Sequence, residues 1–276
     1  MSFEPLLLAF DLDGTLVPRD QAIPVPILGA IRRVEAAGHF VTVITGRTQS
    51  SAQPFLDALR VRHAFGTTQG ARVSTPTGQV LFEAHLTPEE TRALIAATTP
   101  LTHEFFVTTG AGERFYVIDP NRLTLSGRPY WGWALEEGHE VLPFSSYKDE
   151  PVGKVVFHSE DAPGVHAQLR ASHPHLNFYP WETKFLEVTH TLGHKGAALE
   201  LIARELGVPQ SRTVAFGDGN NDLTMLEWAG RGVAVGFGSE ADDSGFAQVT
   251  VASPEDHGVA LWLEQHVLAA VSDTGA

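Results

Sequence analysis

The chain contains no cysteine among its 276 residues, and basic residues are few. Without cysteine there is no disulfide, no thiolate metal site and no cysteine nucleophile. Lysine and arginine number 19 against 33 aspartates and glutamates, which gives a net charge of −14. An acidic surface does not attract nucleic acid or anionic lipid, so we expect neither as a partner. An anionic substrate therefore needs local positive groups or a metal ion in order to bind.

Long hydrophobic runs are also missing. The apolar stretch that follows Glu4 is only about seven residues long and has no basic leader, so it is too short for a signal peptide or a membrane span. Hydrophobic residues make up 43% of the chain and charged residues 19%, an ordinary globular composition. We expect a cytoplasmic protein that does not enter a membrane. No amphipathic stripe or exposed patch is visible in the sequence, so the oligomeric state stays open.

Strand and helix patterns alternate at both ends of the chain. Residues 6–10 form an apolar run without alternation, which is typical of a strand buried on both faces of a parallel sheet. A helical pattern over 24–37, a strand over 39–44 and a helix over 49–59 follow. The alternation returns late in the chain with a helix over 195–206, a strand over 213–216, a helix over 222–228, strands over 232–235 and 249–251, and a helix over 255–268.

The middle of the chain has a different pattern, richer in aromatic and β-branched residues. Its predicted elements are strands over 115–118, 154–158 and 176–179 and helices over 87–98 and 162–171. We therefore predict an α/β protein with a doubly wound, Rossmann-like parallel sheet. Residues 1–82 and 189–276 form this core, and residues 83–188 form an inserted α+β domain.

Two aspartates follow the first predicted strand, in the segment Asp11-Leu12-Asp13-Gly14-Thr15. Side chains two residues apart on a strand point the same way, so Asp11 and Asp13 can enter one pocket while Leu12 packs into the core. Ligands bind at the carboxyl edge of an open parallel sheet. One carboxylate can attack phosphorus, and a neighbouring carboxyl can protonate the leaving alcohol. Taken alone, the segment is equally compatible with a solvated turn.

Two further segments lie at predicted helix starts. Thr45-Gly46-Arg47 combines a hydroxyl with backbone N–H groups, which can bind an anion. Taken alone, Thr45 is better explained as a helix N-cap and Gly46 as a turn residue. Lys195 lies in the first turn of a helix, whereas lysine is favoured at the opposite end. A locally unfavourable residue often accompanies function, although a surface lysine also explains this one.

The segment Gly217 to Asp222, with sequence GDGNND, joins a predicted strand to a helix. Asp218 is expected at the strand tip and Asp222 one helical turn later. Mg²⁺ prefers a few carboxylate oxygens, completed by water and substrate oxygens. Asp11, Asp218 and a backbone carbonyl near Asp13 would meet that need. A capped helix after a glycine-rich loop accounts for the same residues.

Together the four segments carry more weight than each alone, because all are predicted at the same edge of one sheet. They supply a nucleophile, an acid/base, a hydroxyl, a cation and a second carboxylate. Phosphoryl transfer requires this inventory, since it depends on positioning and on neutralisation of the phosphoryl oxygens.

In order and content the motifs resemble those of haloacid dehalogenase (HAD) superfamily phosphatases of the Cof-type group. They are DLDGT at 11–15, TGR at 45–47, HKG at 194–196 and GDGNND at 217–222. The resemblance implies a HAD core and a large α+β cap that selects the substrate. It also implies a Mg²⁺-dependent phosphomonoester hydrolase that acts on a small phosphorylated metabolite, with a sugar phosphate favoured, through an aspartyl-phosphate intermediate.

The resemblance also implies a role for each matching residue. Asp11 is implied as nucleophile and metal ligand, and Asp13 as general acid/base with its backbone carbonyl on the metal. Lys195 is implied as the residue that neutralises charge during catalysis. The other implied roles are phosphate binding by Thr45, Gly46, Lys195 and Asn221, metal binding by Asp218 beside Asp11 and Asp13, and orientation of metal-bound waters by Asp222.

The chain departs from the family pattern at a few positions. Gln69-Gly70-Ala71 stands where the family often has Asn-Gly-Ala, and His194 stands where small or polar residues are more usual. Gln69 and His194 could alter what the pocket admits. Two roles are open for Arg47, which could contact phosphate or pair with an acidic neighbour.

Two other functions compete with hydrolysis. A phosphosugar mutase resembles this core and cap, and would interconvert isomers without releasing phosphate. A receiver-like phospho-switch also combines carboxylates, a threonine and a lysine on a parallel sheet. Receivers are much shorter, lack a cap and do not place the accepting aspartate two residues before another aspartate on the first strand.

Overall fold

The computed structural model describes residues 4–18, 22–99, 101–102, 104–109, 112–118, 140–181 and 183–269. The chain divides into two compact units, a core unit of residues 1–82 and 194–276 and an inserted unit of residues 83–193. The second boundary therefore lies five residues after the one we predicted at 188/189. Residues 189–193 belong to the inserted unit because Thr189 ends one of its strands and the Thr189 hydroxyl donates to the Gly193 carbonyl at 2.7 Å.

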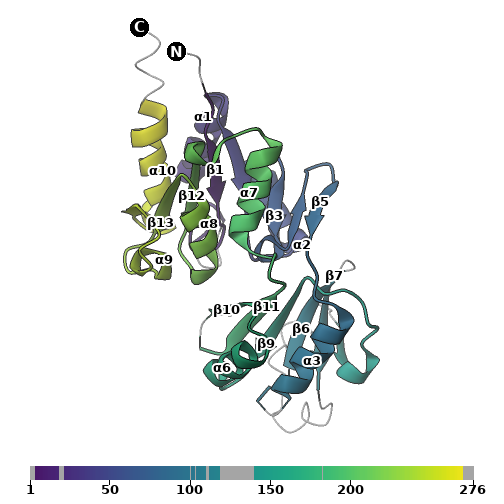
Figure 1. The fold of residues 1–276 in the computed structure, drawn as a ribbon. Coiled ribbons are helices and arrows are strands. Elements are labelled where there is room, and N and C mark those ends of the chain that lie inside the picture. The colour runs from purple at the N-terminus through teal and green to yellow at the C-terminus, as the bar shows by residue number, and fades with distance from the viewer. Residues whose placement is uncertain are drawn as a thin grey trace. The chain divides into compact units, whose positions relative to one another are not determined.

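The core unit contains a parallel sheet of five strands in the order β14-β13-β12-β1-β2 (Figure 1). The strands are β1 (Leu7–Phe10), β2 (Phe40–Val43), β12 (Thr213–Gly217), β13 (Arg231–Val235) and β14 (Val249–Val251). β1 lies between β2 and β12, so two segments separated by most of the sequence are direct neighbours. The predicted doubly wound sheet is confirmed.

Alternate residues of the strands enter separate hydrophobic cores on the two faces of the sheet. On β1, Leu8 and Phe10 face one core and Leu7 and Ala9 the other. Phe10 is fully buried and stacks on Phe216 of β12 with ring centroids 4.7 Å apart. Burial of such a side chain stabilises the fold by about 1.5–3 kcal/mol. These contacts fix the positions of the residues that follow the strands of the sheet.

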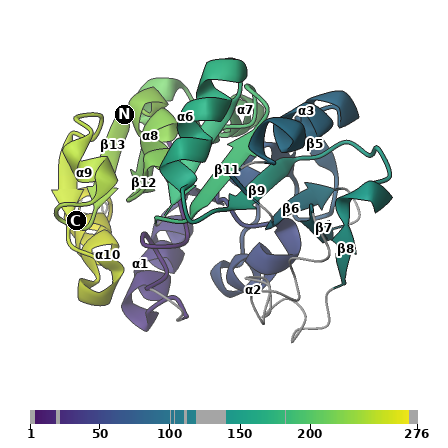
Figure 2. The same ribbon diagram turned by 90° about the horizontal axis from the view of Figure 1, so that it is seen from below.

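Helices cover both faces of this sheet (Figure 2). One face is covered by α1 (Val25–Ala36), α2 (Gln49–Leu59) and α10 (Gly258–Leu263), and the other by α7 (Lys195–Glu205), α8 (Leu223–Trp228) and the short α9 (Glu240–Asp243). A small sheet of β3 (Phe65–Thr67), β4 (Arg72–Ser74) and β5 (Val80–Glu83) follows α2, and its β3 and β4 are antiparallel.

The last predicted helix, residues 255–268, starts later than expected. Pro254–Asp256 forms a separate 3-10 turn, and His257 has a left-handed φ of 60° before α10 begins at Gly258. A Cβ on Gly258 would overlap the Ala252 backbone, so the chain turns tightly here. After α10, Glu264–Leu268 continues as a π-helix.

The inserted unit is built on a six-stranded sheet in the order β10-β11-β9-β6-β7-β8, antiparallel except between β7 and β8. Its strands are β6 (Glu104–Thr109), β7 (Gly112–Val117), β8 (Val141–Pro143), β9 (Lys154–His158), β10 (Asn177–Trp181) and β11 (Phe185–Thr189). Helices α3 (Pro88–Thr98) and α6 (Ala162–Ser172) share a hydrophobic core with the sheet. The predicted α+β character is confirmed.

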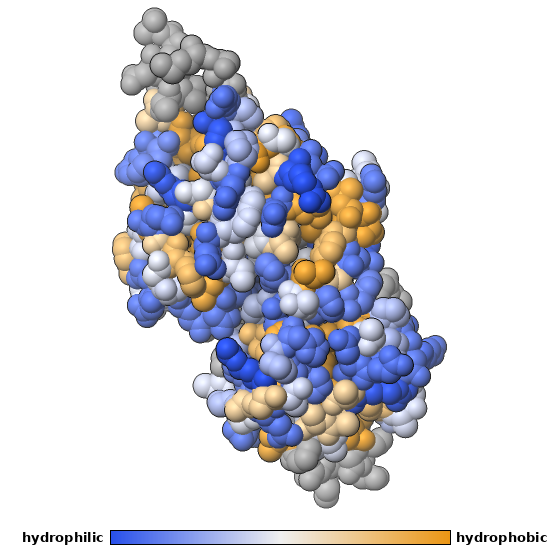
Figure 3. Space-filling view, viewed as in Figure 1, coloured by the Kyte–Doolittle hydropathy of each residue, from blue (hydrophilic) through white to orange (hydrophobic). Residues whose placement is uncertain are grey.

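Hydrophilic residues cover most of the face of the molecule in Figure 3, and apolar residues form small groups between them. Across the described part of the chain, no helix has the length and apolar character needed to cross a membrane.

Candidate active site

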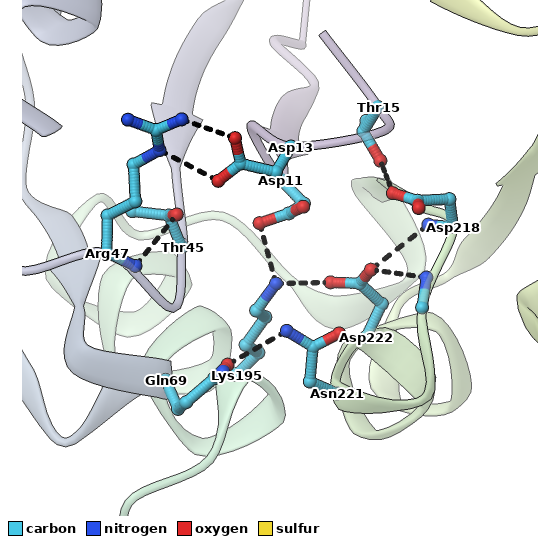
Figure 4. A network of polar contacts seen from close by, with 11 residues as sticks. Asp11, Asp13, Thr15, Thr45, Arg47, Gln69, Lys195, Asp218, Asn221 and Asp222 are labelled. Atoms are coloured by element: carbon cyan, nitrogen blue, oxygen red, sulfur yellow. Dashed lines mark hydrogen bonds and ion pairs between the residues drawn. The ribbon is translucent and has the colours of Figure 1, made fainter. Parts of the chain in front are cut away.

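Asp11 and Asp13 follow β1 at the carboxyl edge of the core sheet (Figure 4). The Asp11 N–H donates to the Phe216 carbonyl at 3.0 Å, so the alignment of β1 with β12 extends to this residue. Asp11 is only 5% exposed, whereas the Asp13 side chain is 54% exposed. Leu12 is fully buried, as the alternation along the strand predicts. One aspartate is thus fixed in the interior and the other reaches the surface.

Lys195 is fully buried and lies between two carboxylates. Its Nζ donates to Asp11 Oδ1 at 2.6 Å and to Asp222 Oδ1 at 2.5 Å. Burial would lower the pKa of this lysine, but the two carboxylates outweigh burial and raise the pKa above its usual value. The residue therefore stays charged. The unfavourable position at the start of α7 is offset by this double ion pair.

Asp222 and Asp218 come from the loop between β12 and α8, which contains a short 3-10 turn over Asn220–Asp222. Asp222 is fully buried, and its Oδ2 accepts the backbone N–H groups of Asp218 and Gly219 at 3.0 Å each. Asp218 is partly buried, and its Oδ1 accepts the Thr15 hydroxyl at 2.8 Å. We did not predict a role for Thr15, although a hydroxyl two residues after Asp13 was a visible signal.

The carboxyl groups of this cluster have perturbed pKa values. Burial raises the pKa of Asp11 well above its usual range; Lys195 opposes this effect, and the neighbouring carboxylates add to it. Burial, with the charge of Asp222, raises the pKa of Asp218 to about 7, although the Thr15 hydrogen bond acts in the opposite direction. Burial is the larger cause of both shifts, and the neighbouring negative charges add to it.

The segment Thr45-Gly46-Arg47 follows β2, but it does not start the next helix. The N-cap of α2 is Thr48, whose hydroxyl accepts the Ser51 N–H at 3.4 Å. The interpretation of Thr45 as an N-cap is therefore wrong, because the helix begins three residues later. Thr45 is fully buried, and its hydroxyl accepts the Arg47 N–H at 3.2 Å.

Of the two roles left open for Arg47, contact with phosphate or pairing with an acidic neighbour, the structure shows the second, because Arg47 pairs with Asp13. Its Nε and Nη2 donate to the two Asp13 oxygens at 2.8 Å and 2.5 Å. The guanidinium also lies over the Phe55 ring, 4.6 Å from the centroid. A two-point contact of this kind fixes the orientation of a carboxylate.

The cluster has the donors and the charge to hold a divalent cation. One carboxylate oxygen from each of Asp11, Asp218 and Asp222 lies within 4.8 Å of the others. Both oxygens of Asp222 already accept hydrogen bonds. This residue is therefore better suited to orient Lys195 and the loop backbone than to bind the metal ion directly. Among the described residues, the second oxygens of Asp11 and Asp218 have no hydrogen-bond partner. Hard oxygen donors of this kind suit Mg²⁺.

The charges of the six ionic side chains lead to the same conclusion. When all four carboxylates are ionised they face two cations, Lys195 and Arg47, which leaves two excess negative charges. A divalent cation would balance them. The carboxylates and cations at the carboxyl edge of this doubly wound sheet are the groups that an enzyme needs in order to transfer a phosphoryl group.

Comparison with known proteins identifies the class. The chain matches the family model of haloacid dehalogenase-like hydrolases over residues 8–263, so it belongs to that family and is a phosphatase. It is 29% identical over 276 residues to the 5-amino-6-(5-phospho-D-ribitylamino)uracil phosphatase YitU of Bacillus subtilis, over 96% of this chain and 99% of that one. The HMP-PP phosphatase of Serratia proteamaculans is 30% identical over 239 residues, with 83% of each chain covered.

The fold also matches solved structures. A sugar phosphatase of HAD subclass IIB superposes with a TM-score of 0.80 and 22% sequence identity, over 94% of this chain and 98% of that one. The resemblance that the motifs indicated is therefore confirmed for the family and the fold.

Proposed function

We propose that the protein is a Mg²⁺-dependent phosphomonoester hydrolase in which Asp11 is the nucleophile. The observation that carries the proposal is the fully buried Lys195, held at 2.6 Å from Asp11 and 2.5 Å from Asp222. A buried cation beside a buried carboxylate offsets the repulsion between that carboxylate and a phosphate dianion. A role in structural stability alone would not require the charge to lie at the ligand-binding edge of the sheet.

The proposed reaction has two halves. First, an Asp11 oxygen bonds to phosphorus, the bond from phosphorus to the leaving alcohol oxygen breaks, and Asp13 gives that oxygen a proton. Second, Asp13 takes a proton from a water molecule whose oxygen attacks the phosphorus, so that inorganic phosphate leaves and the Asp11 carboxylate is restored. Arg47 orients Asp13 through its two hydrogen bonds.

Asp11, Asp218 and the backbone carbonyl of Asp13 would hold the Mg²⁺. The bound ion supplies neutralisation of charge on the phosphoryl oxygens. We assign phosphate binding to Thr45, Gly46, Lys195 and Asn221, and we assign to Asp222 the orientation of the surrounding groups. The three hydrogen bonds that Asp222 accepts, from Lys195 and from two backbone N–H groups, support this orienting role.

The substrate in this proposal is a small phosphorylated metabolite, with a sugar phosphate favoured. Two relatives are named as phosphatases of 5-amino-6-(5-phospho-D-ribitylamino)uracil and of HMP-PP, and a protein of the same fold is described as a sugar phosphatase. We assign selection of the substrate to the inserted unit, residues 83–193, which corresponds to the cap of the family.

The first test is phosphate release from a panel of sugar and cofactor phosphomonoesters, with and without Mg²⁺, by wild type and Asp11→Asn. We expect Mg²⁺-dependent release that the substitution abolishes. Failure of the folded wild type to release phosphate from any compound contradicts the hydrolase. Isomer interconversion without phosphate release would instead identify a mutase.

A further inference from the structure

Three consecutive residues after β3 adopt a left-handed backbone. The φ angles are 54° at Thr68, 60° at Gln69 and 85° at Gly70. Only the third is a glycine, and side chains such as those of threonine and glutamine disfavour this region. Such strain persists where the surroundings fix the backbone, and it gathers at functional sites. We therefore expect the neighbouring segments to hold this turn in its strained conformation.

The turn is fixed between two segments of the candidate active site. The Gln69 N–H donates to the Thr45 carbonyl at 3.0 Å, and the Thr68 N–H donates to the Arg47 carbonyl at 2.8 Å. On the other side, a Cβ on Gly70 would lie 2.5 Å from the His194 carbonyl oxygen, directly before Lys195. The strained backbone thus places residue 69 between the Thr45–Arg47 loop and the start of α7.

The Gln69 side chain contacts two of the proposed phosphate-binding residues, and Figure 4 shows its hydrogen bond with Asn221. It is only 4% exposed, and its Oε1 accepts a hydrogen bond from Asn221 Nδ2 at 3.0 Å. The same carboxamide lies against Gly46, where a Cβ would come within 2.5 Å of Gln69 Nε2. Asn221 Oδ1 in turn lies against Gly219, 2.6 Å from where a Cβ would be. The Nδ2 end of the Asn221 amide is therefore hydrogen-bonded, and its oxygen end lies in the space that the missing Cβ of Gly219 leaves.

We propose that Gln69 is a positioning residue that sets the orientation of the Asn221 carboxamide. The two ends of an asparagine amide have nearly the same shape, so a neighbour must determine which end is the donor. The Gln69 oxygen can only accept, and it therefore selects the Nδ2 end. One Nδ2 hydrogen goes to Gln69, and the second is available for a phosphoryl oxygen. This inference rests on the proposed phosphate-binding role of Asn221.

The Gln69 side chain spans from the strained turn to Asn221 while it covers Gly46. Asn221 lies 152 residues away in the sequence, so the link depends on the fold.

The test is a double-mutant cycle between residues 69 and 221, read by calorimetric binding of inorganic phosphate to the Mg²⁺-loaded protein. Gln69→Met keeps the length of the side chain but removes the acceptor. We expect it to weaken phosphate binding by about three-fold to ten-fold, the range for one hydrogen bond. In an Asn221→Ala background, the same substitution should change phosphate affinity by less than about two-fold.

Gln69→Gly separates this role from the stability of the turn. Glycine adopts positive φ freely, which offsets the loss of the buried side chain, so this variant should unfold near the wild-type temperature and still lose phosphate affinity as Gln69→Met does. Wild-type affinity in both folded variants overturns the proposal, and so does an undiminished loss in the Asn221→Ala background. If the wild type binds phosphate and releases it from substrates while the cycle is additive, only this inference fails. If the wild type does neither, the proposed function fails with it.

Discussion

Two substitutions that remove the same kind of charge from the site should have opposite effects on stability. Asp222→Asn replaces a carboxylate that accepts from Lys195 on one oxygen and from two backbone N–H groups on the other. Whichever way the new amide turns, its NH₂ faces a donor. At least one set of hydrogen bonds is lost, so either the fully buried Lys195 or two partly buried N–H groups lose a partner.

The size of the loss follows from these contacts. A hydrogen bond to a charged group contributes about 1.5–3 kcal/mol, and a buried donor left without a partner costs about 1–3 kcal/mol more. We therefore expect Asp222→Asn to lower the free energy of unfolding by about 3 kcal/mol or more. For a domain of this size that corresponds to a fall in Tm of about 6–12 °C.

Asp11→Asn should behave differently, because burial and like charges already oppose ionisation of Asp11. The amide oxygen of asparagine can still accept from Lys195, and one of the crowded negative charges is gone. We expect the Tm without metal to equal or exceed that of wild type, although activity is lost. Differential scanning calorimetry in a chelator at about pH 7.5 measures both variants and resolves the two units if they unfold separately. A Tm for Asp222→Asn within about 2 °C of wild type, or equal losses in both variants, would refute the reasoning.

Two further predictions concern pH and Arg47. The raised pKa of Asp218, about 7, and that of Asp11 mean that the folded protein without metal holds protons that the unfolded chain has released, so its stability falls as pH rises from about 4 through 7. Mg²⁺ should therefore raise Tm more at about pH 8 than at about pH 5, and an equal increase at both would contradict this. Arg47→Lys keeps the charge but not the two-point contact with Asp13, so kcat should fall about ten-fold. Because the side chain is 29% exposed, Tm should change by less than about 2 °C, and an unchanged kcat would show that Arg47 does not orient Asp13.

The sequence was most informative where apolar periodicity and glycine stops coincide. Helix α2 and strand β14 have their predicted bounds, and most other core elements lie within one or two residues. Prediction was weaker in the inserted unit, where β6 and β11 were missed. The run of aromatic and β-branched residues in β6 was a usable signal for a strand. The position of β6 between β7 and β9 could not be predicted, because pairing between distant segments leaves no local signal in the sequence.

The site divides in the same way. Motif residues such as Asp11, Lys195 and Asp218 were found because they follow strands or start helices at one sheet edge. The partner of Arg47 was not, because phosphate and a carboxylate suit a guanidinium equally well. The link from Gln69 to Asn221 was also out of reach, since it requires a left-handed turn through Thr68 and Gln69 that neither residue type indicates.

The charge arrangement shows how an acidic protein can receive an anionic substrate. With a net charge of −14, the surface as a whole repels a phosphate, and the site adds to that repulsion when its four carboxylates are ionised, because they face only two cations. Burial, with the neighbouring negative charges, raises the pKa values of Asp11 and Asp218. In the proposed enzyme these carboxylates are the groups that would hold the divalent cation, and the buried Lys195 is a further local positive charge that favours a phosphate. The proposed function therefore predicts that both the local stability and substrate binding depend on the metal.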